Sequence, residues 1–523
     1  MTELSTPQFS AQTNGQTPVE KRSGFPFYPA LFICLPILKV WECCLGNYMP
    51  EQFLSILAVL IVTTLAFQAV AFASMKNTDK AGILTLGVIA TIFCWPLFRG
   101  ISQNHLSDLT EAAIYLLLCL NACNFAVRKL SNRMVTTFLN LASLSIITVV
   151  IPIVQGELAQ QNLSQKSLEL VRKEFAEVAP YSQSKPDIYY IVVDAFANQH
   201  TLQDQYQYNS TLIKHLKQRG FFIADESYAN HDRTALSIPS SVNMRYMTDV
   251  LNEPHPFSTV EFFRLLQNNQ VAHLLKGLDY RFINVCSGWE PTHLNPYADV
   301  NEAAGPGCNL EITLLRLTVF EPFGDRSGLL AQVYRSSRMR CFEQADQIAS
   351  ARGPKFVMIH TLICHPPFFL NSRGETSELS TRMMNEPYTK QAYLEQLKFG
   401  ENEVVGLIDK ILSEAKQSKP IIIVQSDHGP ASNEAGFNTN YVNERMRILN
   451  AFYLGEPNNP VHPPVGITPV NSFRWILNRY FGTNLPMLEN HAFAAVPFEN
   501  GPHKEVTDLI TFPRQLSGKN PIQ

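Results

Sequence analysis

The sequence lacks several short patterns that identify common protein classes. No two of its ten cysteines have the CxxC spacing of a zinc site. No dinucleotide- or nucleotide-binding fingerprint lies at a strand-to-helix junction, and no internal repeat or low-complexity tract is present. We expect no nucleic-acid partner.

The apolar residues are distributed unevenly along the chain. Hydrophobic residues make up 46% of the 523 residues, charged residues make up 17%, and the net charge is -3. Residues 25–153 contain several long apolar runs, whereas the remainder has the shorter periodic segments of a soluble α/β protein. The sequence therefore predicts a cytoplasmic tail (1–24), a helical membrane domain (25–155), a linker or juxtamembrane helix (156–185) and an α/β domain (186–523).

The apolar runs predict five membrane spans, each close to the roughly 20 residues that a helix needs to cross a bilayer. They are Tyr28–Cys44, Phe53–Ser74, Ala81–Phe98, Ala112–Val127 and Thr136–Val154. The fourth run is interrupted by Asn121 and Asn124, and the first contains Lys39 and Glu42. A four-span arrangement is therefore an alternative.

The positive charges between the spans predict the orientation. On one side the connections contain several cations, whereas the opposite connections contain only Arg99. The cations are Lys21, Arg22, Lys76, Lys80, Arg128, Lys129 and Arg133. By the positive-inside rule, five spans place the N-terminus in the cytoplasm and everything after Gln155 outside it, in a multi-pass protein of the plasma or inner membrane. A cleaved signal peptide followed by a buried helical core is disfavoured by the long polar N-terminus.

The outer domain alternates strand-like and helix-like runs, which predicts a mixed, mostly parallel sheet with helices on both faces. The candidate strands are Asp187–Val193, Phe221–Ala224, Tyr280–Val285, Lys355–His360, Ile421–Gln425 and Ala451–Leu454. The helical segments include Thr259–Leu278, Ser336–Ala351, Gln391–Ala415 and Val470–Phe481. Cys286 and Cys308 enclose a loop and could form a disulfide, although free buried thiols are an equal alternative.

The strongest chemical signal is the pair Asp427 and His428. A buried apolar strand runs into Ser-Asp-His-Gly, so a carboxylate and an imidazole emerge together at a glycine turn. Such a pair is well placed to bind one divalent ion, with Gly429 allowing close backbone approach. A helix cap by Asp427 with an exposed His428 is the alternative.

Asp194 ends the first strand of the outer domain in the same way. In open α/β sheets, functional groups gather at the carboxyl ends of the strands, so Asp194 could supply a further metal ligand. An aspartate in this position also often forms a turn or caps a helix.

Two hydroxyls, those of Thr234 and Ser237, lie in the segment ThrAlaLeuSerIlePro. A hydroxyl before a helix that is marked by proline would face the positive N-terminal end of that helix. We predict Thr234 as a nucleophile activated by the metal, and Ser237 as the helix cap or the second candidate nucleophile.

Polar residues near these segments are candidates for substrate contacts. His360 and His365 bracket a strand end and its Pro-Pro turn, where one of them could bind a substrate oxygen or protonate a leaving group, and we favour His365. Asn230 and Arg233, beside Thr234, could contact an anionic group, although a turn role is at least as well supported.

These residues together resemble the alkaline phosphatase superfamily in its sulfatase-like branch, especially the membrane-anchored lipoteichoic acid synthases and phosphoethanolamine transferases. The resemblance covers most of Pro186 to Phe481. It implies membrane helices followed by an extracytoplasmic catalytic domain. It also implies the roles of five residues: the metal ligands Asp194, Asp427 and His428, the nucleophile Thr234, which also contacts the metal, and the substrate histidine His365.

The sequence departs from the family pattern at three points. The transferases usually have glutamate at the position of Asp194. The aspartate of this chain is more like the acid of the hydrolytic relatives. Ser241 stands where mature sulfatases have the arginine of their C/S-x-P-x-R motif. The outer domain also lacks the D-x-x-x-H pair of two-metal phosphatases, which predicts a single ion, zinc or manganese in preference to calcium or magnesium.

The resulting hypothesis is a membrane-anchored enzyme that cleaves or transfers a phosphate- or sulfate-ester group through a covalent threonine intermediate. Five spans are more than an anchor requires, which favours a lipid-linked or envelope-glycan substrate. A hydrolase of soluble esters and a catalytically inactive envelope scaffold are the alternatives. A transporter is disfavoured because the spans contain few charges and no paired broken helices.

Overall fold

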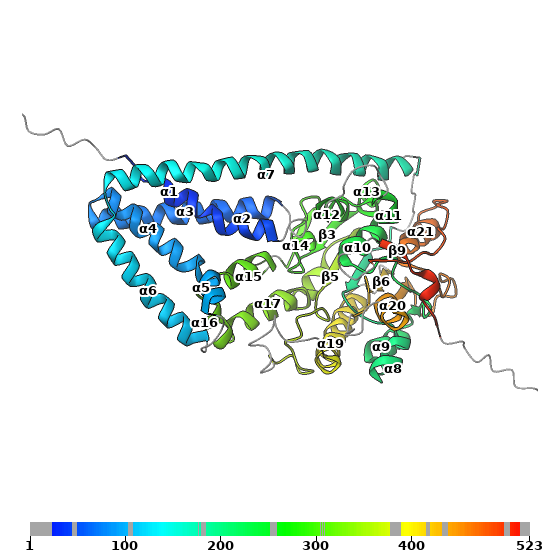
Figure 1. Cartoon of the computed structure of the whole chain (residues 1–523). Helices are drawn as coiled ribbons and strands as arrows, with labels where there is room; N and C mark the ends of the chain where they lie inside the picture. The colour runs from blue at the N-terminus through cyan, green and yellow to red at the C-terminus, as the bar shows by residue number, and fades with distance from the viewer. Residues whose placement is uncertain are drawn as a thin grey trace, which may run out of the picture.

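The computed structural model describes residues 24–43, 50–102, 108–175, 177–178, 185–251, 259–303, 305, 307, 309–376, 389–414, 419–430, 438–495 and 503–512. An N-terminal group of helices lies beside a larger α/β domain, and the helix α7 runs along both (Figure 1). The N-terminal helices are α1 (Tyr28–Phe32), α2 (Cys34–Cys43), α3 (Pro50–Met75), α4 (Thr78–Phe93), α5 (Trp95–Ser102), α6 (Asp108–Lys129) and α7 (Arg133–Glu174).

Three segments are long and apolar enough to cross a membrane: Phe53–Met75, Asp108–Lys129 and Arg133–Pro152. The pair α4 and α5 would be a fourth span, bent by 55°. The first predicted span is divided between α1 and α2, and its apolar helix Tyr28–Leu38 is shorter than a span. Among the described residues, length and composition thus support three or four spans, and the fifth stays a prediction.

The helix α7 joins the last predicted span to the outer domain without a break. It begins at Arg133, where the side chain of Asn132 accepts a hydrogen bond from the Val135 amide over 3.0 Å, and it runs for 42 residues. Near its C-terminal end, Leu168 and Val171 are buried in the core of the outer domain. The predicted linker is therefore largely helical, and its end is packed against the domain that follows it.

The outer domain is built on a seven-stranded sheet with the order β2-β7-β6-β1-β5-β3-β4. Strands β1, β3, β4, β5 and β6 are parallel, whereas β7 is antiparallel both to β6 and to the edge strand β2. The strands are β1 (Ile188–Val193), β2 (Phe222–Ile223), β3 (Arg281–Val285), β4 (Val300–Glu302), β5 (Lys355–Thr361), β6 (Ile421–Gln425) and β7 (Asn450–Leu454). All six predicted strands are confirmed; the short edge strand β4 was not predicted.

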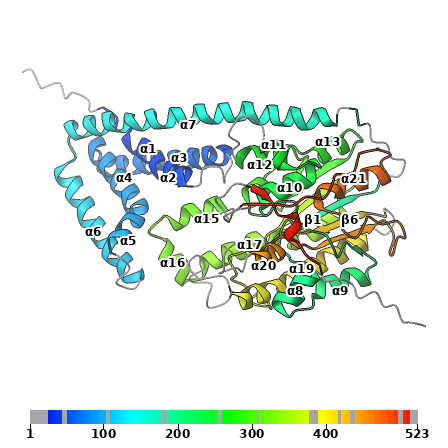
Figure 2. The same cartoon turned by 45° about the vertical axis from the view of Figure 1, so that its right-hand side comes forward.

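Helices cover both faces of this sheet (Figure 2). They are α8 (Gln199–Tyr206), α9 (Thr211–Gln218), α10 (Thr234–Asn243), α11 (Met247–Leu251), α12 (Thr259–Gln267), α13 (Gln270–Lys276), α14 (Glu290–His293), α15 (Asn309–Arg316), α16 (Glu321–Arg326), α17 (Leu329–Glu343), α18 (Ala345–Ser350), α19 (Lys390–Glu414), α20 (Thr439–Met446) and α21 (Pro469–Tyr480). A short hairpin of β8 (Phe493–Ala495) and β9 (His503–Glu505) and the 3-10 helix η2 (Thr507–Leu509) follow.

Two apolar cores lie on opposite faces of the sheet. In β1, Tyr189, Ile191 and Val193 belong to the core under α9, α17 and α19, whereas Tyr190 and Val192 belong to the core under α10, α12 and α21. All six residues of β1 are buried, as expected for a central parallel strand covered on both faces. The predicted fold, an α/β domain with a mostly parallel sheet after N-terminal apolar helices, is confirmed.

Two predicted helices are each divided in two. Thr259–Leu278 forms α12 and α13, because the side chain of Asn269 caps α13 through a 2.8 Å hydrogen bond from the Ala272 amide. The segment Ser336–Ala351 is divided between α17 and α18 at Gln344. Cys308 lies outside the described residues, so its pairing with Cys286 stays a prediction.

Candidate active site

The candidate residues lie at the carboxyl ends of three neighbouring parallel strands, β6, β1 and β5. Asp194 follows β1, Asp427 and His428 follow β6, and His360 lies near the end of β5, paired with Val192 of β1. All four side chains are at most 3% exposed. Asp194 is at least 166 positions from the other three residues in sequence, and they meet at one edge of the sheet because their strands are adjacent.

Thr234 is placed against this cluster by α10, of which it is the first residue. Its Oγ1 lies 3.0 Å from His428 Nε2 and 3.4 Å from Asp194 Oδ2. The predicted nucleophile is thus at the N-terminus of a ten-residue helix and in contact with two of the predicted metal ligands.

Asp194, Asp427 and His428 each offer one ligand atom, and these atoms lie within 4.8 Å of one another. Asp194 Oδ1 and Asp427 Oδ2 are buried without a hydrogen-bond partner of good geometry among the described residues. Unpaired buried carboxylate oxygens are rare in folded proteins unless a ligand or an ion satisfies them. The donor set, two carboxylates and an imidazole, fits a divalent cation of the zinc or manganese type.

The hydrogen bonds of His428 define its tautomer. Its Nδ1 lies 3.0 Å from the carbonyl oxygen of Gly429, which can only accept a hydrogen bond. The proton is therefore on Nδ1, and the Nε2 lone pair faces Thr234 and the two carboxylates. Burial lowers the pKa of His428 well below its ordinary value, and the nearby Arg445 adds to this effect. A neutral imidazole with a free Nε2 is the form that ligates a metal.

The two carboxylates have opposite pKa shifts. Burial, and then the negative charge of Asp194, raise the pKa of Asp427 to about 7. Burial also acts to raise the pKa of Asp194, but the neighbouring His365, His360 and His428 outweigh it and hold this pKa below its ordinary value. Two buried carboxylates so close together compete for ionisation, and a divalent cation between them would remove this competition.

The backbone around the cluster is tightly constrained. Ala195 has a φ of +61°, a conformation that is uncommon for a residue with a side chain, and its amide donates to Asp427 Oδ1 over 3.3 Å. A Cβ on Gly429 would lie 2.0 Å from the carbonyl oxygen of Glu444, so only glycine fits there. The first feature joins the end of β1 to the loop after β6, and the second lets that loop approach α20 closely.

His360 orients Asp194 and is itself oriented by α14. Its Nε2 lies 3.2 Å from Asp194 Oδ2, and its Nδ1 lies 2.9 Å from Thr292 Oγ1. Because a carboxylate can only accept, Nε2 donates to Asp194 and a neutral ring accepts from Thr292 at Nδ1. The Trp289 ring packs edge-on against His360 at 5.4 Å. The predicted substrate residue His360 therefore contacts a metal-ligand candidate directly.

His365 lies in the turn after β5, where burial lowers its pKa. Its Nδ1 lies 2.6 Å from the Pro366 carbonyl oxygen, and within the described part of the chain no hydrogen bond joins its ring to the other candidate residues. Arg338 of α17 holds this turn by donating to the carbonyl oxygens of His365 (2.7 Å) and Pro366 (2.9 Å). The sequence analysis missed Arg338. Arg338 lies four residues after Tyr334 and three residues before Cys341, so it shares the buried face of α17 with them. This helical spacing is the sequence pattern that could have identified it as a buried arginine.

Ser237 does not cap α10, because the helix begins at Thr234 and Ser237 lies within it. The proline that was expected to mark the helix start, Pro239, also lies inside the helix. The Ser237 hydroxyl is buried and donates to the main-chain oxygen of Asp427 over 2.7 Å. It connects the helix that carries Thr234 to the loop that carries the metal-ligand candidates.

The two other predicted substrate contacts differ in their surroundings. Asn230 is fully buried; its amide accepts from the Val470 amide and donates to the His491 carbonyl oxygen, both over 2.8 Å. Arg233 precedes Thr234 and is one-third exposed, and its Nη2 makes no hydrogen bond among the described residues. The substrate roles of both residues stay predictions, and the surroundings of Arg233 suit such a role better.

Arg445 is a second residue that sequence reasoning missed. From α20 it donates to the carbonyl oxygen of Asp232 over 2.7 Å and to that of Gly429 over 2.8 Å. It thereby joins the segment before Thr234 to the loop after His428. No local pattern marks it, because both partners are distant main-chain atoms.

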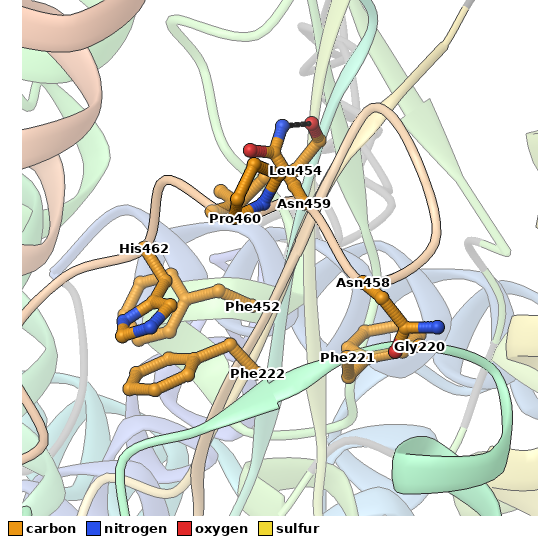
Figure 3. Close-up of a pocket in the computed structure, with 9 residues that line it drawn as sticks. All are labelled: Gly220, Phe221, Phe222, Phe452, Leu454, Asn458, Asn459, Pro460 and His462. Carbon is orange, nitrogen blue, oxygen red and sulfur yellow. Dashed lines mark hydrogen bonds between the residues drawn. The ribbon is translucent and has the colours of Figure 1, made fainter.

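A separate pocket of about 310 Å³ lies at the sheet edge formed by β2 and β7 (Figure 3). Phe222 and His462 stack there with ring centroids 4.0 Å apart, and Asn459 donates to the Leu454 carbonyl oxygen over 3.0 Å. None of the candidate active-site residues lines this pocket.

Three solved structures illustrate what the chain resembles. The zinc complex of the C-terminal periplasmic domain of EptC from Escherichia coli is 11% identical, with a TM-score of 0.43, and the alignment covers 64% of this chain and 98% of that one. The membrane protein lipooligosaccharide phosphoethanolamine transferase A (EptA) from Neisseria meningitidis is 11% identical (TM-score 0.34; coverage 82% and 89%). The periplasmic domain of the phosphoethanolamine transferase EptC from Campylobacter jejuni is 15% identical (TM-score 0.35; coverage 60% and 94%).

No curated protein sequence matches the chain. The sulfatase family model, however, matches residues 186–456, which include the whole cluster of Asp194, Thr234, His360, Asp427 and His428. The chain belongs to the sulfatase family, within the alkaline phosphatase superfamily.

Proposed function

We propose that the protein is a membrane-anchored, metal-dependent enzyme that cleaves or transfers a phosphate- or sulfate-ester group, with Thr234 as nucleophile. The observation that carries this proposal is the position of Thr234 Oγ1, 3.0 Å from His428 Nε2 and 3.4 Å from Asp194 Oδ2, at the start of α10. A hydroxyl beside metal ligands and a positive helix end is suited to attack an anionic ester.

Asp194, Asp427 and His428, together with the Thr234 hydroxyl, would hold the ion. When bound, a divalent ion of this kind supplies a lowered hydroxyl pKa and an electrostatic clamp on the ester oxygens. Thr234 Oγ forms a bond to phosphorus or sulfur as the bond to the leaving oxygen breaks. In this proposal the Thr234 hydroxyl proton passes to Asp194 Oδ2, which lies 3.4 Å from that hydroxyl, and His365 donates a proton to the leaving oxygen.

Water or an acceptor hydroxyl then attacks the same centre and releases Thr234. Attack by water gives hydrolysis, and attack by an acceptor hydroxyl gives transfer. We propose a lipid-linked or envelope-glycan substrate, because the catalytic domain is attached to several membrane helices through the continuous helix α7. The distribution of Lys and Arg supports a cytoplasmic N-terminus and a catalytic domain on the opposite side.

The test is intact-mass analysis of the full chain, purified in detergent with zinc or manganese and incubated with phospholipid and sulfate-ester donors. We expect a donor-specific mass gain that is lost in Thr234→Ala, with turnover falling by at least about 10³-fold. Thr439→Ala is the matched control, because Thr439 is also the first residue of a helix, α20, and is exposed. An adduct that persists in Thr234→Ala would exclude this nucleophile, and bound metal without adduct or turnover would favour the scaffold alternative.

A further inference from the structure

An apolar cavity of about 560 Å³ lies where the N-terminal helices meet the outer domain. This volume is in the range of protein sites for small ligands. It is lined by residues of α1, α2, α4 and α5 and by the outer-domain segment around α15: Phe32, Leu35, Pro36, Val40, Leu86, Ile89, Ala90, Phe93, Cys94, Pro96, Leu97, Thr313 and Leu317.

The bend between α4 and α5 shapes this cavity. The two helices meet at Cys94 with an angle of 55°, and Pro96 prevents a continuous helix by removing an amide donor. Residues on both sides of the bend, Phe93 and Leu97, line the cavity. Leu97 is 70% exposed, so the cavity opens on the apolar surface that these helices present to lipid.

The outer domain closes one side of the cavity at the level of the membrane helices. Leu310 and Leu314 of α15 are buried in a cluster with Ile37, Val40 and Phe53. The Val319 amide, just beyond α15, donates to the Ile92 carbonyl oxygen over 3.0 Å. A segment of the catalytic domain is thereby packed into the N-terminal helices.

A charged pocket of about 340 Å³ adjoins the cavity and shares Pro96 and Leu317 with it. In this pocket Arg99 pairs with Glu321 at 3.1 Å and, outside it, with Asp108 at 2.9 Å. Arg316 lies 3.6 Å from Asp325. The pocket itself is lined by these two arginines and one acid, Glu321, while Asp108 and Asp325 lie beside the arginines from outside it. Both cations therefore already face carboxylates, so the pocket suits a headgroup that carries both charges better than one that carries only negative charge.

The wall of the cavity is connected to the candidate active site through α14. The carboxylate of Glu290, which is fully buried, accepts a hydrogen bond from the Leu310 amide at the start of α15. Two residues later, Thr292 holds His360, which contacts Asp194. One short helix therefore anchors both the cavity wall and the histidine that orients a metal-ligand candidate.

We propose that this cavity binds one acyl chain of a zwitterionic membrane phospholipid, with its headgroup beside Arg99 and Arg316, and that the bound lipid supports the active site by fixing α15 and α14. The apolar lining, the adjoining charged pocket and the opening toward the lipid-facing surface together select an amphipathic lipid. Its effect on catalysis rests on the proposed function, whereas its binding does not.

The test uses the full chain in vesicles of phosphatidylethanolamine and phosphatidylglycerol. Either lipid is added as a probe with a photoactivatable diazirine in its acyl chain, and the labelled peptides are identified by mass spectrometry. We expect the phosphatidylethanolamine probe to label the α15 peptide that contains Thr313 and Leu317, more strongly than the phosphatidylglycerol probe does. Ala90→Trp, which fills the cavity from α4, should abolish this labelling.

Ala122→Trp is the matched control, because Ala122 is an exposed alanine of α6 that does not line the cavity. Retained membrane insertion and an unchanged melting temperature show that Ala90→Trp is folded. Absence of α15 labelling while α3 and α6 are labelled would overturn the proposal, as would unchanged labelling in Ala90→Trp. Equal labelling by both probes would overturn the assignment of the headgroup.

The same labelling is measured in Thr234→Ala, so that lipid binding is tested even if the proposed chemistry is wrong. If binding is confirmed, reduced turnover and weaker zinc binding in Ala90→Trp, but not in Ala122→Trp, are expected. Unchanged turnover and zinc affinity in a variant that no longer binds the lipid would overturn the supporting role.

Discussion

The N-terminal helices and the outer domain place the same apolar residue types in opposite surroundings. In the apolar stretch of each of the three long spans, at most 18% of the residues are buried, and large side chains such as Leu117 (62%) and Phe138 (67%) are exposed. In the outer domain, every residue of β1 is buried. The difference shows that the first region is solvated by lipid and the second by water, because only lipid accepts so many exposed apolar groups.

Buried polar atoms without a hydrogen-bond partner occur in both regions, for example Tyr28 Oη among the N-terminal helices, but among the described residues two such carboxylates meet beside a histidine only at the ends of β1 and β6. Among the N-terminal helices, Thr136 donates to Asp79 over 2.6 Å and Gln68 donates to the Pro26 carbonyl oxygen over 2.7 Å. In the outer domain, Asp194 and Asp427 keep buried oxygens without a partner of good geometry among the described residues. The hydrogen bonds of Thr136 and Gln68 serve the packing of helices, whereas two neighbouring carboxylates that each keep one oxygen without a partner, beside a histidine, indicate a ligand site.

If the outer domain holds the metal site and the N-terminal helices do not, the largest loss of metal binding and turnover is expected from Asp427→Asn. Loss of one carboxylate ligand should remove metal binding and reduce turnover by about 10³-fold or more. Saturating zinc should raise the melting temperature of the unmodified chain, since a ligand at 100 times its Kd stabilises by about 2.7 kcal/mol. Elemental analysis and thermal unfolding with and without zinc measure both effects.

Asp346→Asn is the control for this substitution, because Asp346 is exposed and pairs only with Lys410 among the described residues. It should leave metal content and unfolding unchanged. Stoichiometric zinc in Asp427→Asn would show that the ion is held elsewhere.

An intermediate effect is expected from His360→Gln. Groups that orient metal ligands typically contribute 10- to 100-fold to metal affinity, and His360 Nε2 donates to Asp194 over 3.2 Å. Zinc titration should therefore show a Kd that is weaker by about 10- to 100-fold. His462→Gln at the sheet edge, where His462 stacks on Phe222, is the matched control. Equal affinities in the two variants would contradict the orienting role.

The smallest effect is expected within the membrane region, from Thr136→Val. This change removes the hydrogen bond to Asp79 and should destabilise the helices by about 1 kcal/mol, the usual magnitude for polar contacts between membrane helices. Unfolding in mixed micelles measures the change. Thr148→Val is the control on the same helix, because Thr148 is exposed and, among the residues that the structure describes, its hydroxyl bonds only to the nearby Ser145 carbonyl oxygen. A loss of zinc affinity in Thr136→Val would show that the two regions are coupled more strongly than this comparison implies.

Much of the fold was predictable because its signals are local. Six strands were recognised from short apolar runs, and Asp194, Asp427 and His428 were recognised because each follows such a run directly. The long apolar segments marked the membrane region in the same way. Strand β4 and the break at Asn269 were missed, since a three-residue edge strand and a single capping residue scarcely change the periodicity.

The sequence by itself determined the order of strands and helices, the division into a lipid-facing and a water-facing region, and the residue types available at the strand ends. Only the tertiary structure decided that β6, β1 and β5 are neighbours and that α10 presents Thr234 to their ends. It also made His360 a partner of Asp194, Ser237 a link to Asp427 and Arg338 the support of His365. These contacts join residues far apart in the chain, and packing rather than local periodicity brings them together.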